Sequence, residues 1–173
     1  YGWGCRYDGS GIYQVGSSAT ISGSTISKNA EEGIYSSNAV LFVSDSTIHD
    51  NGDDYTDLGI KVNGSPSQVS LLRNTVSDNA GDGIYVDAGA VVQNNTVTGN
   101  GDKEADWGIA VFGPGVTVQD NILIGNASGI FIGNDIGTSG LVSRNVVSRS
   151  TATGFSGIGI LADGDGQPTV SNN

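Results

Sequence analysis

Short apolar stretches with alternating hydrophobic and polar positions recur along the whole chain. Seven of them open with the dipeptide Gly-Ile, as in "GIYV" (83–86), where alternation sends Ile84 and Val86 to one face and Tyr85 to the other. A period of roughly 20–30 residues with no helical pattern predicts a β-solenoid. The pairs are Gly11-Ile12, Gly33-Ile34, Gly59-Ile60, Gly83-Ile84, Gly108-Ile109, Gly129-Ile130 and Gly157-Ile158.

Two polar columns keep the same order as the Gly-Ile pairs. We expect the constant Ile to stack inside the core and the constant Gly to mark a bend that needs room or a positive φ. Asn tolerates a left-handed bend, and stacked Asn amides can hydrogen-bond along the solenoid axis. The first column is Ser24, Ser46, Asn74, Asn95, Asn121, Asn145 and Asn172, and the second is Asn29, Asn51, Asn79, Asn100, Asn126 and Ser150.

Each coil is therefore predicted to contain three strands: one opened by Gly-Ile, one such as 116–119, and, after an Asn corner, one such as 96–98. The stretches "NTVSDNAGDGIYV" (74–86) and "NTVTGN" (95–100) resemble the right-handed parallel β-helix of the pectin-lyase-like superfamily, and the likeness covers almost the whole chain. It implies an all-β, right-handed single-stranded parallel β-helix of about seven coils, a single domain over 1–173. In that superfamily, polysaccharide chemistry takes place in the groove outside the first strand.

The outward positions of the first strand vary from coil to coil, which leaves them open to carry function. The residue after Gly-Ile is Tyr13, Tyr35, Lys61, Tyr85, Ala110, Phe131 and Gly159, and two residues later come Val15, Ser37, Asn63, Asp87, Phe112, Gly133 and Leu161. Aromatic rings at this spacing make a flat apolar strip suited to stacking on sugars. We predict a sugar-binding surface formed by Tyr13, Tyr35, Asn63, Asp87, Trp107, Phe112 and Phe131.

Lys61 lies between two tyrosines of this column and is the candidate catalytic base, with Tyr85 and Tyr35 as candidate acids. This arrangement resembles the chemistry of polysaccharide lyases and alginate C5-epimerases. The Asp-Pro-His motif of the epimerases is absent, because His49 is followed by Asp50 and no Pro. Two other interpretations stay open: binding without catalysis, and an aromatic column that only covers the sheet.

The loops before the Gly-Ile pairs alternate in length, with 3, 7, 3, 7, 2 and 6 residues after the second polar column. The long loops are 52–58, 101–107 and 151–156, and the first two are acidic. Clustered carboxylates suit Ca²⁺. The candidate ligands are Asp53, Asp54, Asp57, Asp82, Asp102 and Asp106, and the alternative is a solvated acidic face without a site.

Composition narrows the classes of partner. The chain has 18 acidic and 7 basic residues, a formal net charge of −11, which disfavours nucleic acid as a partner. Cys5 is the single cysteine, and no apolar run is long enough to span a membrane. Because the sequence lacks Met, we expect a processed product or a piece of a longer protein. We expect this protein to be secreted or located at the cell surface and to bind a polysaccharide or cell-surface glycan. The alternative is a structural filament subunit, adhesin or phage-spike segment that assembles end to end.

Overall fold

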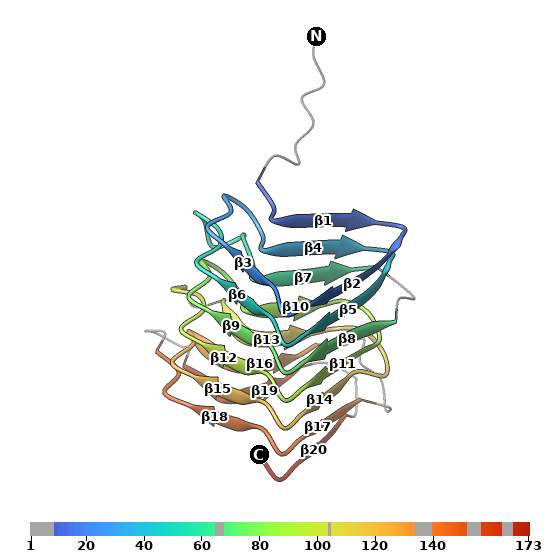
Figure 1. The fold of residues 1–173 in the computed structure, drawn as a ribbon. Coiled ribbons are helices and arrows are strands. Elements are labelled where there is room, and N and C mark those ends of the chain that lie inside the picture. The colour runs from blue at the N-terminus through green and yellow to red at the C-terminus, as the bar shows by residue number, and fades with distance from the viewer. Residues whose placement is uncertain (1–8, 65–67, 104, 134–139, 152–156, 164–167) are drawn as a thin grey trace.

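The computed structural model describes residues 9–64, 68–103, 105–133, 140–151, 157–163 and 168–173, and these form three parallel β-sheets stacked along one axis (Figure 1). Sheet 1 contains β1 (Ile12–Val15), β4 (Ile34–Ser37), β7 (Ile60–Asn63), β10 (Ile84–Val86), β13 (Trp107–Val111), β16 (Ser128–Ile132) and β19 (Ile160–Ala162). Sheet 2 contains β2 (Ser18–Ser22), β5 (Val40–Ser44), β8 (Val69–Leu72), β11 (Ala90–Gln93), β14 (Thr117–Gln119), β17 (Leu141–Ser143) and β20 (Thr169–Ser171). Sheet 3 contains β3 (Thr25–Ser27), β6 (Thr47–His49), β9 (Thr75–Ser77), β12 (Thr96–Thr98), β15 (Ile122–Ile124) and β18 (Val146–Ser148).

The predicted all-β parallel solenoid is confirmed. Successive strands of the chain go to sheet 1, sheet 2 and sheet 3 in turn, so each coil contributes one strand to each sheet. The described strands form about six turns, because sheet 3 has six strands while sheets 1 and 2 have seven each. This number is close to the seven coils predicted from the sequence. The described residues contain no α-helix, and hence no helix long and apolar enough to cross a membrane.

The core of the solenoid is a row of isoleucines, as predicted. Ile34, Ile60, Ile84, Ile109 and Ile130 are in register on sheet 1, and all five are fully buried. The prediction was wrong in the last coil. Ile160, and not Ile158, pairs with Ile130, which puts Leu161 beside Phe131 in place of Gly159.

In the first six Gly-Ile pairs the glycine provides room and does not adopt a positive φ, whereas Gly157 of the last pair has φ +86. A Cβ atom on Gly83 would lie 2.7 Å from the carbonyl oxygen of Gly108 and 2.8 Å from Val97 Cγ1. Both contacts are shorter than van der Waals distance, so no side chain fits where this corner is packed against the next coil.

Asparagine ladders join the coils at the two corners of sheet 3. In the first, Asn95 Nδ2 donates to Asn121 Oδ1 in the next coil (3.0 Å) and to the Leu71 carbonyl in the preceding coil (2.9 Å), while Asn74 donates to Asn95 Oδ1. Each amide therefore ties three consecutive coils together. The members of this ladder are Asn74, Asn95, Asn121, Asn145 and Asn173, after Ser24 and Ser46, and those of the second are Asn29, Asn51, Asn79, Asn100 and Asn126.

Two details of the predicted ladders need correction. Asn173, and not Asn172, accepts the hydrogen bond from Asn145 Nδ2 (2.9 Å). The left-handed backbone belongs to the residue before each ladder position: Asn94 has φ +57 and Asn172 has φ +54. The turn therefore precedes the ladder, which leaves the ladder amide itself in the interior.

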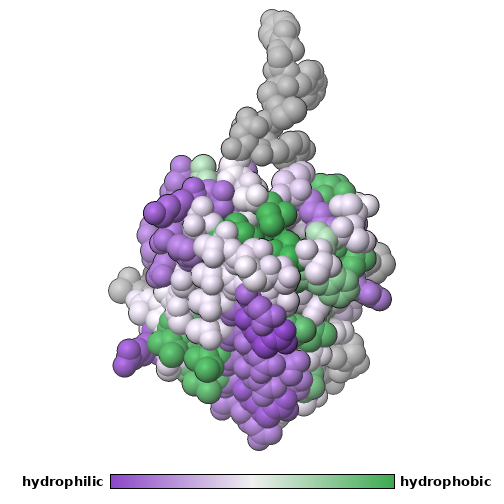
Figure 2. Space-filling model, in the orientation of Figure 1, coloured by the Kyte–Doolittle hydropathy of each residue, from purple (hydrophilic) through white to green (hydrophobic). Residues whose placement is uncertain are grey.

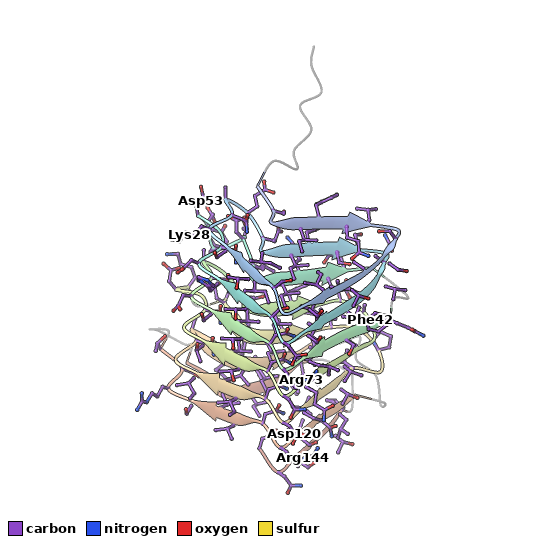
Figure 3. All side chains as sticks on the ribbon, viewed as in Figure 1. Lys28, Phe42, Asp53, Arg73, Asp120 and Arg144 are labelled. Carbon is purple, nitrogen blue, oxygen red and sulfur yellow. The ribbon has the colours of Figure 1, made fainter. Side chains whose placement is uncertain are left out.

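The left-handed positions between sheets 2 and 3 form a hydrophilic stripe along the outside of the molecule (Figure 2). Arg73 lies against Asp45, and Arg144 against Asp120, with two N–H···O contacts in each pair. Figure 3 labels Arg73, Asp120 and Arg144 along this side of the molecule. The guanidinium groups lower the pKa of both carboxyls. Because all four side chains are solvent-accessible, the pairs align neighbouring coils and contribute little to stability.

Candidate functional site

The outer face of sheet 1 brings together the residues predicted for the site. Tyr35, Lys61 and Tyr85 occupy the same outward position on three adjacent strands, β4, β7 and β10. Phe131 continues this column on β16, after Ala110. We call this surface the sheet 1 face.

The two tyrosines of the first coils stack on each other. The rings of Tyr13 and Tyr35 lie 4.9 Å apart at an interplanar angle of 4°. Neighbouring strands lie about 4.8 Å apart, so parallel rings on adjacent strands stack along the axis of the solenoid. This stacked pair begins the aromatic column of the sheet 1 face.

Four further rings form an aromatic cluster, which consists of Tyr85, Trp107, Phe112 and Phe131. Trp107 contacts Phe131 (5.1 Å, 44°), Phe131 contacts Phe112 (5.2 Å, 48°), and Phe112 contacts Tyr85 (5.1 Å, 35°). All four side chains are half-buried. Because the rings are tilted against one another, part of several ring faces stays open to solvent.

Lys61 is held in an ion pair between the stacked tyrosines and the aromatic cluster. Its Nζ donates to Glu32 Oε1 (2.9 Å), and Ser10 Oγ donates to Glu32 Oε2 (3.1 Å). The ammonium group also lies 5.9 Å from the centre of the Tyr35 ring. Lys61 is thus a paired cation, whose charge a buried carboxylate already balances.

Asn63 and Asp87 lie beside this ion pair, on the neighbouring outward positions. Asn63 Nδ2 donates to the Tyr35 hydroxyl at 3.5 Å, the limit of a hydrogen bond. Burial raises the pKa of Tyr85, and the charges of Asp87 and Asp82 raise it further. The Tyr85 hydroxyl is therefore a proton donor over the physiological range.

Asp82 lies at the start of β10, next to the aromatic cluster. Its Oδ1 accepts a hydrogen bond of 2.5 Å from the backbone N–H of Trp107. Loss of hydration raises the pKa of this carboxyl to about 7, and the nearby charge of Asp106 acts in the same direction, while the Trp107 N–H and Lys61 lower it.

The two long acidic loops have the same internal structure. Asp57 Oδ2 accepts from the backbone N–H groups of Asp53 and Asp54, and Asp106 Oδ2 accepts from those of Asp102 and Lys103. Each aspartate closes its own loop. The third predicted long loop, 151–156, lies outside the described residues except for Thr151.

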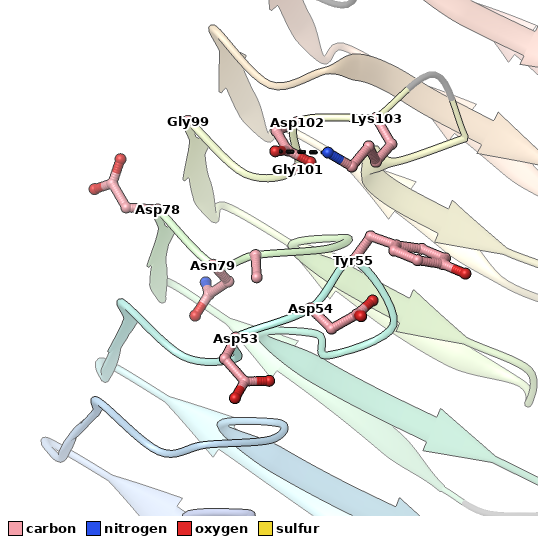
Figure 4. Close-up of a pocket in the computed structure, with 10 residues that line it drawn as sticks. Asp53, Asp54, Tyr55, Asp78, Asn79, Gly99, Gly101, Asp102 and Lys103 are labelled. Carbon is pink, nitrogen blue, oxygen red and sulfur yellow. Dashed lines mark hydrogen bonds and ion pairs between the residues drawn. The ribbon is translucent and has the colours of Figure 1, made fainter.

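A hollow of about 430 Å³ lies between the two described loops (Figure 4). Asp53, Asp54 and Tyr55 line it from the first loop, and Asp102 and Lys103, joined by an ion pair of 3.0 Å, from the second. Over the part of the chain that the structure describes, no three carboxylates converge in an arrangement that could hold a metal ion. Calcium binding in these loops stays a prediction.

Sequence reasoning missed the contacts of Glu32 and Asp82. It gave Glu32 no role and named Asp82 only as a candidate calcium ligand, whereas in the structure Glu32 contacts Lys61 and Asp82 accepts from the Trp107 backbone N–H. Alternation gave no signal for these contacts: each acid directly precedes a Gly-Ile pair, two residues before a buried isoleucine, where alternation alone would direct it inward.

The comparisons with known proteins agree with this architecture. No curated protein and no solved structure matches the chain. The family described as "Right handed beta helix region" matches residues 4–173, almost the entire chain. Together with the three stacked parallel sheets and the asparagine ladders, this match places the chain in the right-handed β-helix family.

Proposed function

We propose that this β-helix is an extracellular module that binds a polysaccharide along the sheet 1 face. The observation that carries the proposal is the aromatic cluster of Tyr85, Trp107, Phe112 and Phe131, whose tilted rings lie on the outside of the sheet. Such rings bury the apolar C–H faces of sugars, while polar groups beside them bind the hydroxyls. Asn63 and Asp87 lie in the right place for the second role.

The charges of the surface favour a neutral polysaccharide over a polyuronate. The positive charge of Lys61 is balanced by Glu32, and Asp82 and Asp87 lie close by. The whole chain carries a net charge of −11. An anionic polymer would be repelled at long range and would find no unpaired cation at Lys61.

A glycan array, read with and without calcium, tests the proposal. The critical variant is Phe131→Ala, and the matched control is Phe42→Ala, which removes an exposed ring from the outer face of sheet 2. We expect Phe131→Ala to weaken binding about tenfold, the effect of losing one sugar-stacking ring, and Phe42→Ala to leave it unchanged. Equal losses in both variants, or no glycan bound by the wild type, contradict the proposal.

Catalysis at Lys61, Tyr35 and Tyr85 is a separate prediction. An assay for unsaturated products tests it on any uronate-containing glycan that binds, because β-elimination needs the uronate carboxyl group, with Lys61→Ala and Tyr85→Phe as variants. A lyase requires both substitutions to abolish the products. Binding without products assigns the surface to recognition alone.

End-to-end assembly into a filament stays the alternative role. The strand edges of one parallel β-solenoid can pair with those of another chain. Light scattering of the purified protein distinguishes the two roles, because a monodisperse monomer excludes a filament subunit.

A further inference from the structure

We propose that Asp82 is a positioning residue, whose carboxylate fixes Trp107 in the aromatic cluster through the Trp107 backbone N–H. The consequence for glycan affinity rests on the proposed function, whereas the consequence for Trp107 does not.

Two hydrogen bonds from adjacent residues hold the backbone of Trp107. The Trp107 N–H donates to Asp82 Oδ1 (2.5 Å), and the Trp107 carbonyl accepts from the N–H of Gly83 (3.0 Å). Both polar groups of the Trp107 backbone are thus bound to the coil that precedes it. Once Asp82 is ionised, its hydrogen bond is about twice as strong as one between neutral groups, so above the pKa of about 7 the first bond is the stronger constraint.

Trp107 needs such a constraint because of its place in the chain. It follows directly on the long loop 101–106 and opens β13. Asp106 closes that loop from within, but its side-chain hydrogen bonds go to Asp102 and Lys103 and do not reach the cluster. The Asp82 contact is the side-chain contact that ties the end of the loop to the start of β10, the strand that carries Tyr85, and it adds to the backbone hydrogen bond from Gly83.

The choice of aspartate fits this role. Glu32 occupies the equivalent position before Gly33, and the Gly33 N–H donates to the carbonyl of Leu58 (3.0 Å), just as Gly83 donates to that of Trp107. The longer side chain of Glu32 reaches outward to Lys61 and Ser10. The shorter side chain of Asp82 turns back to the backbone of the next coil.

The position of the Trp107 ring connects Asp82 to the rest of the surface. The ring lies against Phe131, which contacts Phe112, which in turn contacts Tyr85. A shift of the Trp107 backbone therefore reaches every member of the cluster. The stacked pair of Tyr13 and Tyr35 has no part in this series of contacts and is expected to stay in place.

Tryptophan fluorescence tests the proposal without any ligand. The chain has two tryptophans, so Trp3→Phe leaves Trp107 as the single tryptophan, and long-wavelength excitation avoids the six tyrosines. In this background, Asp82→Ala should shift the emission to the red and raise quenching by acrylamide, because the ring becomes more exposed. Asp82→Asn should restore both signals, because the amide oxygen still accepts the Trp107 N–H. Asp57→Ala is the matched control, since it removes the closing aspartate of the other long loop. All measurements are made with EDTA.

The same variants are then measured for glycan binding. Asp82→Ala should weaken binding about fivefold, the effect of losing one hydrogen bond of ordinary strength, and Asp82→Asn should recover most of the loss. Unchanged fluorescence in Asp82→Ala, or a failure of Asp82→Asn to restore it, overturns the inference even if the glycan still binds. A wild type that binds no glycan overturns the proposed function and leaves the fluorescence result standing.

Hydrogen exchange covers the case in which Asp82→Ala does not fold. In the wild type, the Trp107 amide should exchange far more slowly than the amides at the tip of the loop 101–106. If they exchange equally fast, the Asp82 contact does not hold Trp107 and the inference is wrong.

Discussion

Two neighbouring asparagines illustrate how position decides the role of a residue in this fold. Asn94 is exposed and takes the left-handed backbone at the corner, while Asn95 is buried and joins the ladder. Their side chains are identical, yet the amide of Asn95 makes every hydrogen bond available to it and that of Asn94 faces solvent. A buried amide with all its partners stabilises the fold, because each partner would otherwise be buried without one.

Replacing these two asparagines should have very different effects. Asn95→Ala leaves the N–H groups of Asn74 and the Leu71 carbonyl without partners, so we expect a loss of roughly 2–4 kcal/mol in the free energy of unfolding. Asn94→Gly should be neutral or slightly stabilising, because Gly adopts a positive φ freely. Urea denaturation of both variants measures the difference, and equal destabilisation would contradict the assigned roles.

The raised pKa of Asp82 makes stability depend on pH. The folded carboxyl has a pKa of about 7, above the ordinary 3.8, so between these values the folded state binds more protons than the unfolded state. Stability should therefore fall as pH rises through this range. Asp82→Asn removes the titration and keeps the acceptor, so its Tm should exceed that of the wild type most at the alkaline end. A Tm difference that is the same at every pH contradicts the shifted pKa.

The sequence predicted the buried isoleucines and most of the ladder because both repeat through the chain. The prediction failed where two neighbouring residues of the same type could occupy the same position in the coil. In "GIGI" (157–160) a shift of two residues keeps the same face inward, so only pairing with Ile130 selects Ile160. In "NN" (172–173) either asparagine suits either role. The partners of Glu32 and Asp82 depend on contacts between coils, which alternation along one strand does not contain.

At the scale of the element, the two described long loops share one hydrogen-bonding arrangement. Both follow a ladder asparagine with a glycine of positive φ, Gly52 or Gly101, and both end on an aspartate that accepts two backbone N–H groups. The strands and the alternation of loop length could be predicted from the spacing of apolar residues. The closing role of the two aspartates could not, since in the sequence they belong to a general excess of acid.

The two closing aspartates should differ in their contribution to stability. Asp106 is buried and Asp57 is half-exposed, so water replaces the lost hydrogen bonds more easily in the first loop. We expect Asp57→Ala to cost about 0.5–1 kcal/mol and Asp106→Ala about 1–3 kcal/mol. Thermal unfolding of both variants compares them. A larger loss of stability in Asp57→Ala than in Asp106→Ala would contradict the expectation that the more buried aspartate contributes more.

At the scale of the whole molecule, charge opposes the compact state while the stacked core and the ladders favour it. A chain of 173 residues with a net charge of −11 repels itself in the folded form. The exposed pairs of Arg73 with Asp45 and Arg144 with Asp120 relieve this only locally. The excess of acidic over basic residues could be predicted from the composition, but the pairing of particular side chains across coils could be seen only in the structure.

Salt should therefore stabilise this protein. Raising the NaCl concentration screens repulsion among exposed carboxylates, and we expect Tm to rise. The double variant Asp53→Asn/Asp54→Asn removes two charges from the loop around the hollow and should reduce the salt dependence. If Tm falls with salt in the wild type, attractive ion pairs outweigh the repulsion and the net charge is not the controlling term.

The direction of the ladders has a consequence for how such a protein can change its length. In the middle of the ladders, amides such as those of Asn95 and Asn100 donate both to the coil after them and to the main chain of the coil before them, so these coils present the same groups to both neighbours. A duplicated coil inserted anywhere in the middle finds complementary groups on both sides without any compensating substitution. Evolution, or an engineer, can therefore lengthen the molecule one coil at a time, whereas a single residue added inside a strand would shift the pairing of that strand with the coils on both sides.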